Sequence, residues 1–230
     1  MSTAEHVIER PSNNPASTHP LGLIQILIKP VEFFSSLRVN RKLGMNILLI
    51  LAIYGVVSFF LAKYMMQSSE ITSILSPELQ NGSTYNILYI GTTLLSVVQF
   101  IFNVLITTVI FKVILMFSKV GVSFKGLYHI VFIAQVPIII GKIINLLFIE
   151  QGTMDTPVTS LGFTIQNIIE SNLIVNLLTN FEIFNLWSLF LIGLGVSVCV
   201  GVSRKKSYIL VFTTWGIFIT LSSIIVTLVN

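Results

Sequence analysis

The chain has 230 residues, of which 54% are hydrophobic and only 10% are charged, whereas an ordinary soluble domain has about 25% charged residues. A water-soluble fold of this length would lack the charges that solvate a surface, so the composition excludes that class and indicates a membrane protein. The formal net charge is +4, but the basic residues lie in short loops between apolar runs, which argues against a nucleic-acid partner. The single cysteine, Cys199, lies inside an apolar run, so an intramolecular disulfide is excluded and a metal cluster is not expected.

Residues 1–20 are rich in Ser, Thr, Asn and Pro and have no apolar periodicity. We therefore expect a disordered cytoplasmic tail. His6 and His19 of this tail are expected to be solvated, because no second metal ligand lies at helical spacing. The first long apolar run begins only at Gly44, so a cleavable signal peptide is not expected.

Residues 21–43 form a segment that is too short to span a membrane before Pro30 but apolar enough to seek its interface. Pro30 and Glu32 suit the first turn of a helix, where a missing N–H costs nothing and a negative charge is stabilised. Phe33 and Phe34 then lie on one face. The pattern predicts a short interfacial helix that leads into the first span.

A helix needs about 20 apolar residues to cross a hydrocarbon core about 30 Å thick. Five segments meet this requirement, so residues 44–230 are predicted to be an all-α integral membrane domain, a five-transmembrane-helix bundle accompanied by short interfacial helices. An earlier start of the second span, near Ile87, is an alternative. The predicted spans are Gly44–Ala62, Leu94–Phe117, Leu127–Ile149, Phe181–Val202 and Tyr208–Val229.

Basic residues predict the orientation, because loops rich in Lys and Arg stay on the cytoplasmic side. Ten of the thirteen basic residues lie before the first span, after the second or after the fourth: Arg10, Lys29, Arg38, Arg41, Lys42, Lys119, Lys125, Arg204, Lys205 and Lys206. We therefore expect a multi-pass protein of the cell membrane with a cytoplasmic N-terminus and an extracytoplasmic C-terminus. The run from Arg204 to Lys206 is interpreted as a topology signal, with binding of anionic lipid headgroups as the alternative.

The loop from Glu150 to Asn180 is not uniformly polar. Over residues 161–178 apolar side chains approximate one helical face and polar side chains the other. This pattern favours an amphipathic helix on the outer surface, with a re-entrant segment as the alternative.

Polar residues within spans are functional candidates, because they are costly in lipid. Gln99, Asn103 and Thr107 recur at intervals of four in the second span, so this stripe is expected to face other helices or water. Gln135, Lys142 and Asn145 lie near one face of the third span, where Pro137 interrupts the regular hydrogen bonding. The two stripes are interpreted as interhelical hydrogen bonds, with a substrate or ion path as the alternative.

Lys142 lies about two turns from the predicted outer end of its span. Its ammonium must therefore reach outer water, point into a wet cavity or find a carboxylate. Glu182, at the outer mouth of the fourth span, is the first candidate partner, and Glu150 is the second. The alternative for Glu182 is an interfacial charge that faces outer water.

The fourth span carries further candidate contact residues. Trp187 lies at a depth where indole rings commonly sit below the headgroups. Gly193, Ser197 and Gly201 form a ridge of small residues at intervals of four, which lets another helix approach closely. We therefore expect this span to make the main helix contacts.

Three motifs together resemble the Yip-domain family of five-span membrane proteins: KPVEFF before the first span, AQVPIIIG in the third and FEIFNLWSLFLIGLGVSVCVGVSRKK in the fourth. The resemblance covers about residues 28–225. It implies that Pro137 matches a proline of the third span. It also assigns the family's fourth-span positions to Glu182, Phe184, Trp187, Gly193, Gly195 and Arg204 to Lys206.

The branches of that family differ in their cytoplasmic part. The eukaryotic branch, associated with Rab proteins and vesicle traffic, has a longer cytoplasmic arm and a DLYGP-type motif, and neither stands in this sequence. The short tail is more similar to the prokaryotic branch. Some members of that branch accompany ABC-type exporters as accessory subunits.

Catalytic motifs are absent from the sequence: it contains no HExxH, no Gly-rich phosphate loop after a strand and no GxSxG elbow. His129, alone at the start of the third span, is interpreted as an interfacial residue. We therefore expect no enzyme activity, no catalytic or metal-binding residues and no cofactor.

The leading hypothesis is a scaffold or an accessory and assembly factor for another membrane complex, for which an ABC-type exporter is the suggested case. Its partners would be the lipid bilayer and other membrane proteins, including a second copy of the chain, with the fourth span as the contact. The alternatives are a small transporter or channel subunit and a lipid-shaping protein.

Overall fold

The computed structural model describes residues 22–39, 44–67, 82–118, 121–148, 156–169 and 171–229. These residues form an all-α structure without a regular strand, which confirms the predicted fold class. The predicted tail of residues 1–20 lies outside them. The helices are α1 (Gly22–Ile28), α2 (Pro30–Val39), α3 (Gly44–Gln67), α5 (Ser83–Phe117), α6 (Phe124–Ile133), α7 (Val136–Leu147), α8 (Leu161–Ile165), α9 (Asn172–Thr179), α10 (Ile183–Val200) and α11 (Arg204–Val229).

Five segments of the described chain are long and apolar enough to cross a membrane: α3, α5, α6 with α7, α10 and α11. Their bounds differ from the predicted ones mainly at one end of the bundle. Helix α3 continues to Gln67, beyond the predicted end at Ala62, and α5 begins at Ser83 rather than Leu94. With 35 residues, α5 is about 50 Å long, so it must tilt across or project beyond a core about 30 Å thick.

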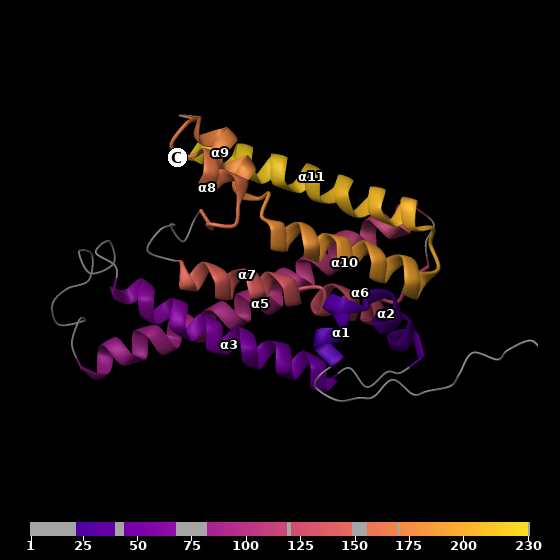
Figure 1. The fold of residues 1–230 in the computed structure, drawn as a ribbon, viewed down its shortest axis with the longest axis horizontal. Helices are drawn as coiled ribbons and strands as arrows, with labels where there is room; N and C mark the ends of the chain where they lie inside the picture. The colour runs from indigo at the N-terminus through magenta and orange to yellow at the C-terminus, as the bar shows by residue number, and fades with distance from the viewer. Residues whose placement is uncertain are drawn as a thin grey trace, which may run out of the picture.

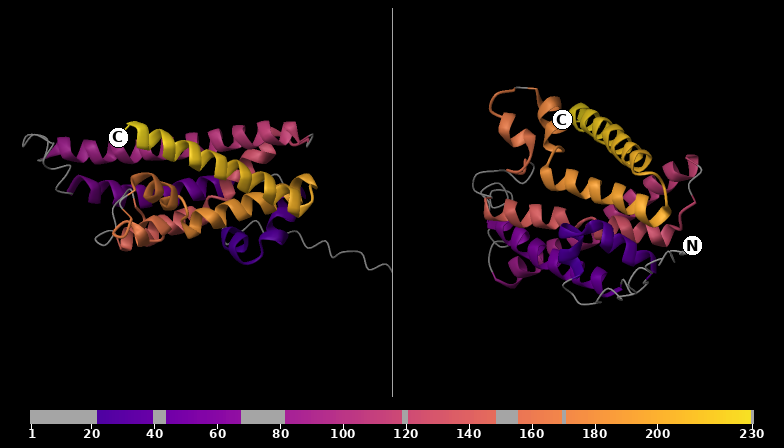
Figure 2. Two further views of the ribbon diagram at one scale, coloured as in Figure 1. Left: turned by 90° about the horizontal axis from the view of Figure 1, so that it is seen from above. Right: turned by 45° about the vertical axis from the view of Figure 1, so that its right-hand side comes forward.

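The long helices run roughly along one axis, and α10 lies between α11 on one side and α6 and α7 on the other (Figure 1). Helix α3 packs against α5 (Figure 2). Both helices also contact the third span, α3 mainly at α7 and α5 at α6. We call the end of the bundle that holds α8 and α9 the Glu182 end, and the opposite end, which holds α1 and α2, the Arg204 end. The first helix of the third span begins at the Arg204 end, and the second finishes at the Glu182 end.

The third span is broken in the middle. Helix α6 ends at Ile133, Ala134 and Gln135 form a turn, and α7 begins with Pro137 in its first turn. Proline has no N–H to donate, and its ring would clash with the carbonyl four residues earlier, which is that of Ile133. The break therefore falls where the sequence places its proline.

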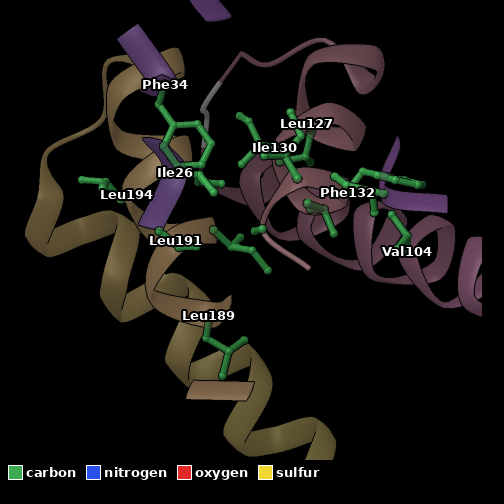
Figure 3. Close-up of a cluster of buried hydrophobic side chains, with 14 of the residues drawn as sticks. Ile26, Phe34, Val104, Leu127, Ile130, Phe132, Leu189, Leu191 and Leu194 are labelled. Atoms are coloured by element: carbon green, nitrogen blue, oxygen red, sulfur yellow. The ribbon is translucent and has the colours of Figure 1, made fainter. Parts of the chain in front are cut away.

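Buried apolar side chains gather where the N-terminal helices meet α6 and α10 (Figure 3). Phe34 of α2 is 0% exposed and lies against Ile130 of α6 and the backbone of Gly195 of α10. Ile26 of α1 is also fully buried. The segment expected to lie only at the membrane interface is thus two helices that pack into the bundle at its Arg204 end.

The single amphipathic helix expected over residues 161–178 is instead two short helices, α8 and α9, separated by a turn at residues 166–168. They pack against each other, and a side chain at Gly162 would collide with Thr179. The glycine therefore allows α8 to fold back across the end of α9, which a straight helix would not do. Helix α9 also packs against α11.

The packing predicts opposite effects for two glycine substitutions. A Cβ atom at Gly195 would lie 2.5 Å from Ile130 and 2.8 Å from Phe34, whereas one at Gly91 of α5 would have no neighbour within 4 Å. Gly195→Ala should therefore lower the free energy of unfolding by about 1–3 kcal/mol. Gly91→Ala should leave it unchanged or raise it by up to about 1 kcal/mol. Thermal unfolding in mild detergent measures both, and equal melting temperatures for the two variants would contradict the described packing.

Candidate functional site

A cavity of about 410 Å³ lies at the Glu182 end, bordered by α3, α5, α7, α10 and the segment before α8. Its wall combines apolar side chains, among them Leu61 and Ile138, with a concentrated set of polar ones. The polar residues that matter here are Tyr54, Ser58, Thr92, Lys142, Asn145 and Glu182. Polar side chains at this density within apolar spans mark the cavity as the candidate site.

Glu182 joins three parts of the chain at this cavity. It occupies the N-cap position of α10, but its side chain does not cap that helix. Its Oε1 instead accepts hydrogen bonds from Thr159 Oγ1 at 2.8 Å and from Asn145 Nδ2 at 3.2 Å. The carboxylate thereby ties the start of α10 to α7 and to the segment before α8, since hydrogen bonds to a charged acceptor are stronger than neutral ones.

A glycine of α7 makes this approach possible. A Cβ atom at Gly141 would lie 2.8 Å from the Phe184 ring and 3.0 Å from Glu182 Oε1. Any larger residue would push the start of α10 away from α7 and lengthen the hydrogen bond from Asn145. Sequence reasoning did not single out Gly141, although its place one turn before Asn145 on the same helix was a signal.

Lys142 and Glu182 line the same cavity without direct contact. The described residues contain an ion pair between Lys29 and Glu32 at 3.3 Å but none between Lys142 and Glu182. The Lys142 ammonium lies over the ring of Tyr54, 5.7 Å from its centroid. Of the environments considered for Lys142, the structure places it in a cavity; Glu150, its other candidate partner, lies outside the described residues.

Asn145 leaves one polar atom without a partner. Its amide nitrogen faces the Glu182 carboxylate, because an amide oxygen turned toward that charge would be repelled. Its Oδ1 is consequently directed elsewhere, and it is buried without a hydrogen-bond donor among the residues that the structure describes. Such an atom carries a desolvation cost that a bound donor would remove.

The small-residue ridge of the fourth span begins with a contact inside the chain. A Cβ atom at Gly193 would lie 2.5 Å from the ring of Tyr208, and Ser207 donates a hydrogen bond to the Gly193 carbonyl at 2.6 Å. Ser207 ends the first turn of α11 and Tyr208 begins the second. Gly193 is therefore filled by the next helix of the same chain.

The rest of the ridge has other roles. Ser197 donates a hydrogen bond to the Val202 carbonyl at 2.8 Å. Gly201 has a φ of 79°, and a Cβ atom there would meet no neighbour within 4 Å. Gly201 thus ends α10 in a left-handed conformation that favours glycine, rather than extending a packing face. Trp187 is 38% exposed and stacks near Phe184 outside the cavity wall.

The polar stripe of the second span does not pack against the polar face of the third span. Gln99 and Asn103 are exposed on the outside of the bundle, and neither lines the cavity. The expected pairing of this stripe with the polar face of the third span is therefore wrong. A helix that is apolar on all sides has no hydrophobic periodicity that identifies its buried face. The position of the stripe therefore does not predict whether it faces the bundle or the outside.

Residues missed by sequence reasoning complete the site. Thr159 lies in a loop without any motif, and Tyr54 lies in a span whose polar content is otherwise low. No sequence pattern marks either residue as part of a site. The fold places Tyr54 beside Lys142 and Thr159 beside Glu182. The described residues contain no group of three or more metal-ligating side chains.

The Glu182 contacts generate a test. Glu182→Ala should weaken the attachment of the segment before α8, since Thr159 and Asn145 both lose their acceptor, at a cost of about 1–3 kcal/mol. Hydrogen exchange of the amides in residues 156–165 should accelerate. Glu182→Gln keeps an oxygen acceptor and should change exchange less. Unchanged exchange in the alanine variant would show that the carboxylate does not hold this segment.

Comparison with protein families agrees with this architecture. The model described as the Yip1 domain matches residues 24–226, which include every helix from α2 to α10. Comparison with curated protein sequences and with solved structures gives no match. Since the matched region covers most of the chain and contains its five apolar spans, the chain belongs to the Yip1 domain family.

Proposed function

We propose that this protein is a non-enzymatic scaffold or accessory factor that binds another membrane complex through the outward face of α5. The carrying observation is the exposure of Gln99 and Asn103 near the middle of a membrane-spanning helix. An ABC-type exporter, suggested by the resemblance to prokaryotic family members, is the class of complex to test first.

The surroundings of these amides support the proposal. Val98 and Phe102, the neighbours in sequence, are 50% and 57% exposed, so the two amides stand in an apolar surface that would otherwise meet lipid. Hydrocarbon offers no partner to a side-chain amide, whereas a helix of another protein can donate and accept hydrogen bonds. Each such interhelical bond contributes about 0.6 kcal/mol.

The fourth span is less suited to this role than its small residues suggested. Helix α10 packs against α2, α6, α7 and α11, and the space at Gly193 is already occupied by the Tyr208 ring. A bulky substitution at Gly193 would damage the fold before it tested a partner. The proposed contact therefore moves from α10 to α5.

A small transporter or channel subunit is the second candidate, favoured by the cavity at Lys142. A second cavity of about 510 Å³, lined by Lys125 and His129, lies at the Arg204 end. Between the two, Val131 to Ala134 of the third span are fully buried apolar residues. These residues place an apolar layer of the third span between the two cavities, and the scaffold role has the better support.

A lipid-shaping role through the N-terminal helices has less support still. Such helices act by inserting an apolar face into one leaflet. In this chain the apolar face of α2 holds Phe33 and Phe34, which are buried in the bundle. These two side chains of α2 are therefore not available for insertion, although Ile24 and Ile28 of α1 are exposed.

The proposal is tested by removing both amides together. Gln99→Leu with Asn103→Leu should leave folding intact, because both side chains are exposed, but should weaken a partner held by two such bonds about tenfold. The measurement is mass spectrometry of proteins that co-purify in mild detergent from native membranes.

Asn86→Leu is the matched control, because Asn86 is exposed on the same helix outside the stripe. It should retain every partner that the unaltered protein retains. Equal recovery of partners by the double variant would remove α5 as the contact surface.

A further inference from the structure

We propose that the cavity at the Glu182 end binds the headgroup of an amine-bearing phospholipid, with the phosphate at Lys142 and the amine at Glu182. This site lies inside the bundle and does not depend on the outward face of α5. Its volume of about 410 Å³ falls within the range of about 300–1,000 Å³ typical of small-molecule sites.

The cavity offers bonding groups that the described residues leave unused. The Lys142 ammonium carries three donors, yet no acceptor in the described part of the chain is hydrogen-bonded to it, and its close neighbour is the Tyr54 ring. The Glu182 carboxylate accepts hydrogen bonds at Oε1 from two described donors, Thr159 and Asn145. A ligand that brings an acceptor to Lys142 and a donor to Glu182 would add bonds at both groups.

The charges of the cavity favour a zwitterion. Lys142 and Glu182 carry opposite charges at separate points of the same wall, and they do not form a direct ion pair. A plain anion at Lys142 would be opposed by the Glu182 carboxylate, and a plain cation at Glu182 would be opposed by the ammonium. A headgroup with separated negative and positive charges meets both.

The order of residues along α7 matches the order of groups in a phospholipid. Ile138, Lys142 and Asn145 line the cavity at helical spacing, so they follow one another along one face toward the Glu182 end. Glu182 Oε1 lies between Gly141 and Asn145 along this helix, since it is hydrogen-bonded to Asn145 and lies 3.0 Å from the place of a Cβ atom at Gly141. The wall thus presents an apolar group below a cation and a carboxylate. A lipid entering from this leaflet presents its glycerol and acyl chains deepest, then the phosphate, then the amine.

Hydrogen bonding distinguishes between amine headgroups. A primary ammonium has three N–H donors for the Glu182 carboxylate, whereas a trimethylammonium group has none. The Glu182 carboxylate therefore favours phosphatidylethanolamine over phosphatidylcholine. An anionic glycerol headgroup leaves the Glu182 charge without a cation.

The test is native mass spectrometry of the delipidated full chain titrated with phosphatidylethanolamine, phosphatidylcholine and phosphatidylglycerol of identical acyl chains. Phosphatidylethanolamine should be retained about tenfold better than the other two. Lys142→Met should lose that retention about tenfold. The matched control is Lys63→Met, since Lys63 is an exposed lysine of α3 near the same end; it should behave as the unaltered protein.

A second variant separates recognition from a structural effect. Glu182→Gln leaves the cavity with the single positive charge of Lys142, so phosphatidylglycerol should now be retained better than phosphatidylethanolamine. A loss of fold would lower retention of both lipids equally and cannot produce this reversal. Glu182→Gln is expected to fold because it keeps an acceptor for Thr159 and Asn145.

Three results would overturn the proposal. The first is equal retention of the three lipids by the unaltered protein, and the second is undiminished retention of phosphatidylethanolamine by Lys142→Met. The third is complete displacement of the lipid by an equal concentration of free phosphoethanolamine, which would assign the cavity to a soluble ligand. None of these results bears on the partner contact of α5, which the co-purification experiment tests separately.

Discussion

The structure depends on how closely α10 approaches its neighbours. Three glycines set that distance: Gly193 receives the Tyr208 ring, Gly195 receives Phe34 and Ile130, and Gly141 of α7 receives Phe184. Within a bilayer the hydrophobic effect gives helices little reason to associate, because lipid tails are as apolar as the side chains. Close van der Waals contact must then supply the attraction. At each of these glycines an aromatic ring lies directly against the helix backbone.

The polar part of the molecule is organised around this apolar centre. Because Gly141 lets α10 start close to α7, the Glu182 carboxylate comes within reach of Asn145 and Thr159. It is thereby hydrogen-bonded to these two residues, and among the described residues the Lys142 ammonium has the Tyr54 ring as its neighbour and no direct counter-ion. The hydrogen bonds of Glu182 thus hold the helices together at this end, and they border a cavity that contains both Glu182 and Lys142. The apolar layer around Phe132 separates that cavity from the opposite end.

The sequence was sufficient for features that depend on local constraints. Bilayer thickness sets the length of a span, so five spans were predicted, and Pro137 marked the break in the third. Which face of each span is buried was not predictable in the same way. Lipid and protein interior are both apolar, so a span lacks the hydrophobic periodicity that marks the buried face of a helix in a soluble protein. Gly193 lies against a neighbouring helix whereas Gly201, on the same ridge, ends its helix in open space. Thr159 became recognisable only once Glu182 lay beside it.

The position of Phe34 has a consequence for how the chain is assembled. Its neighbours in the finished bundle, Ile130 and Gly195, are far along the chain, and Cys199 also contacts the Phe34 carbonyl through its sulfur, 3.4 Å away. During synthesis from the amino terminus, α2 emerges before any of these residues exists. Phe34 therefore cannot reach its final packing against Gly195 until the fourth span has been inserted. Docking of α2 is then a late step of biogenesis. Most of the chain must be synthesised before α2 can pack against α6 and α10.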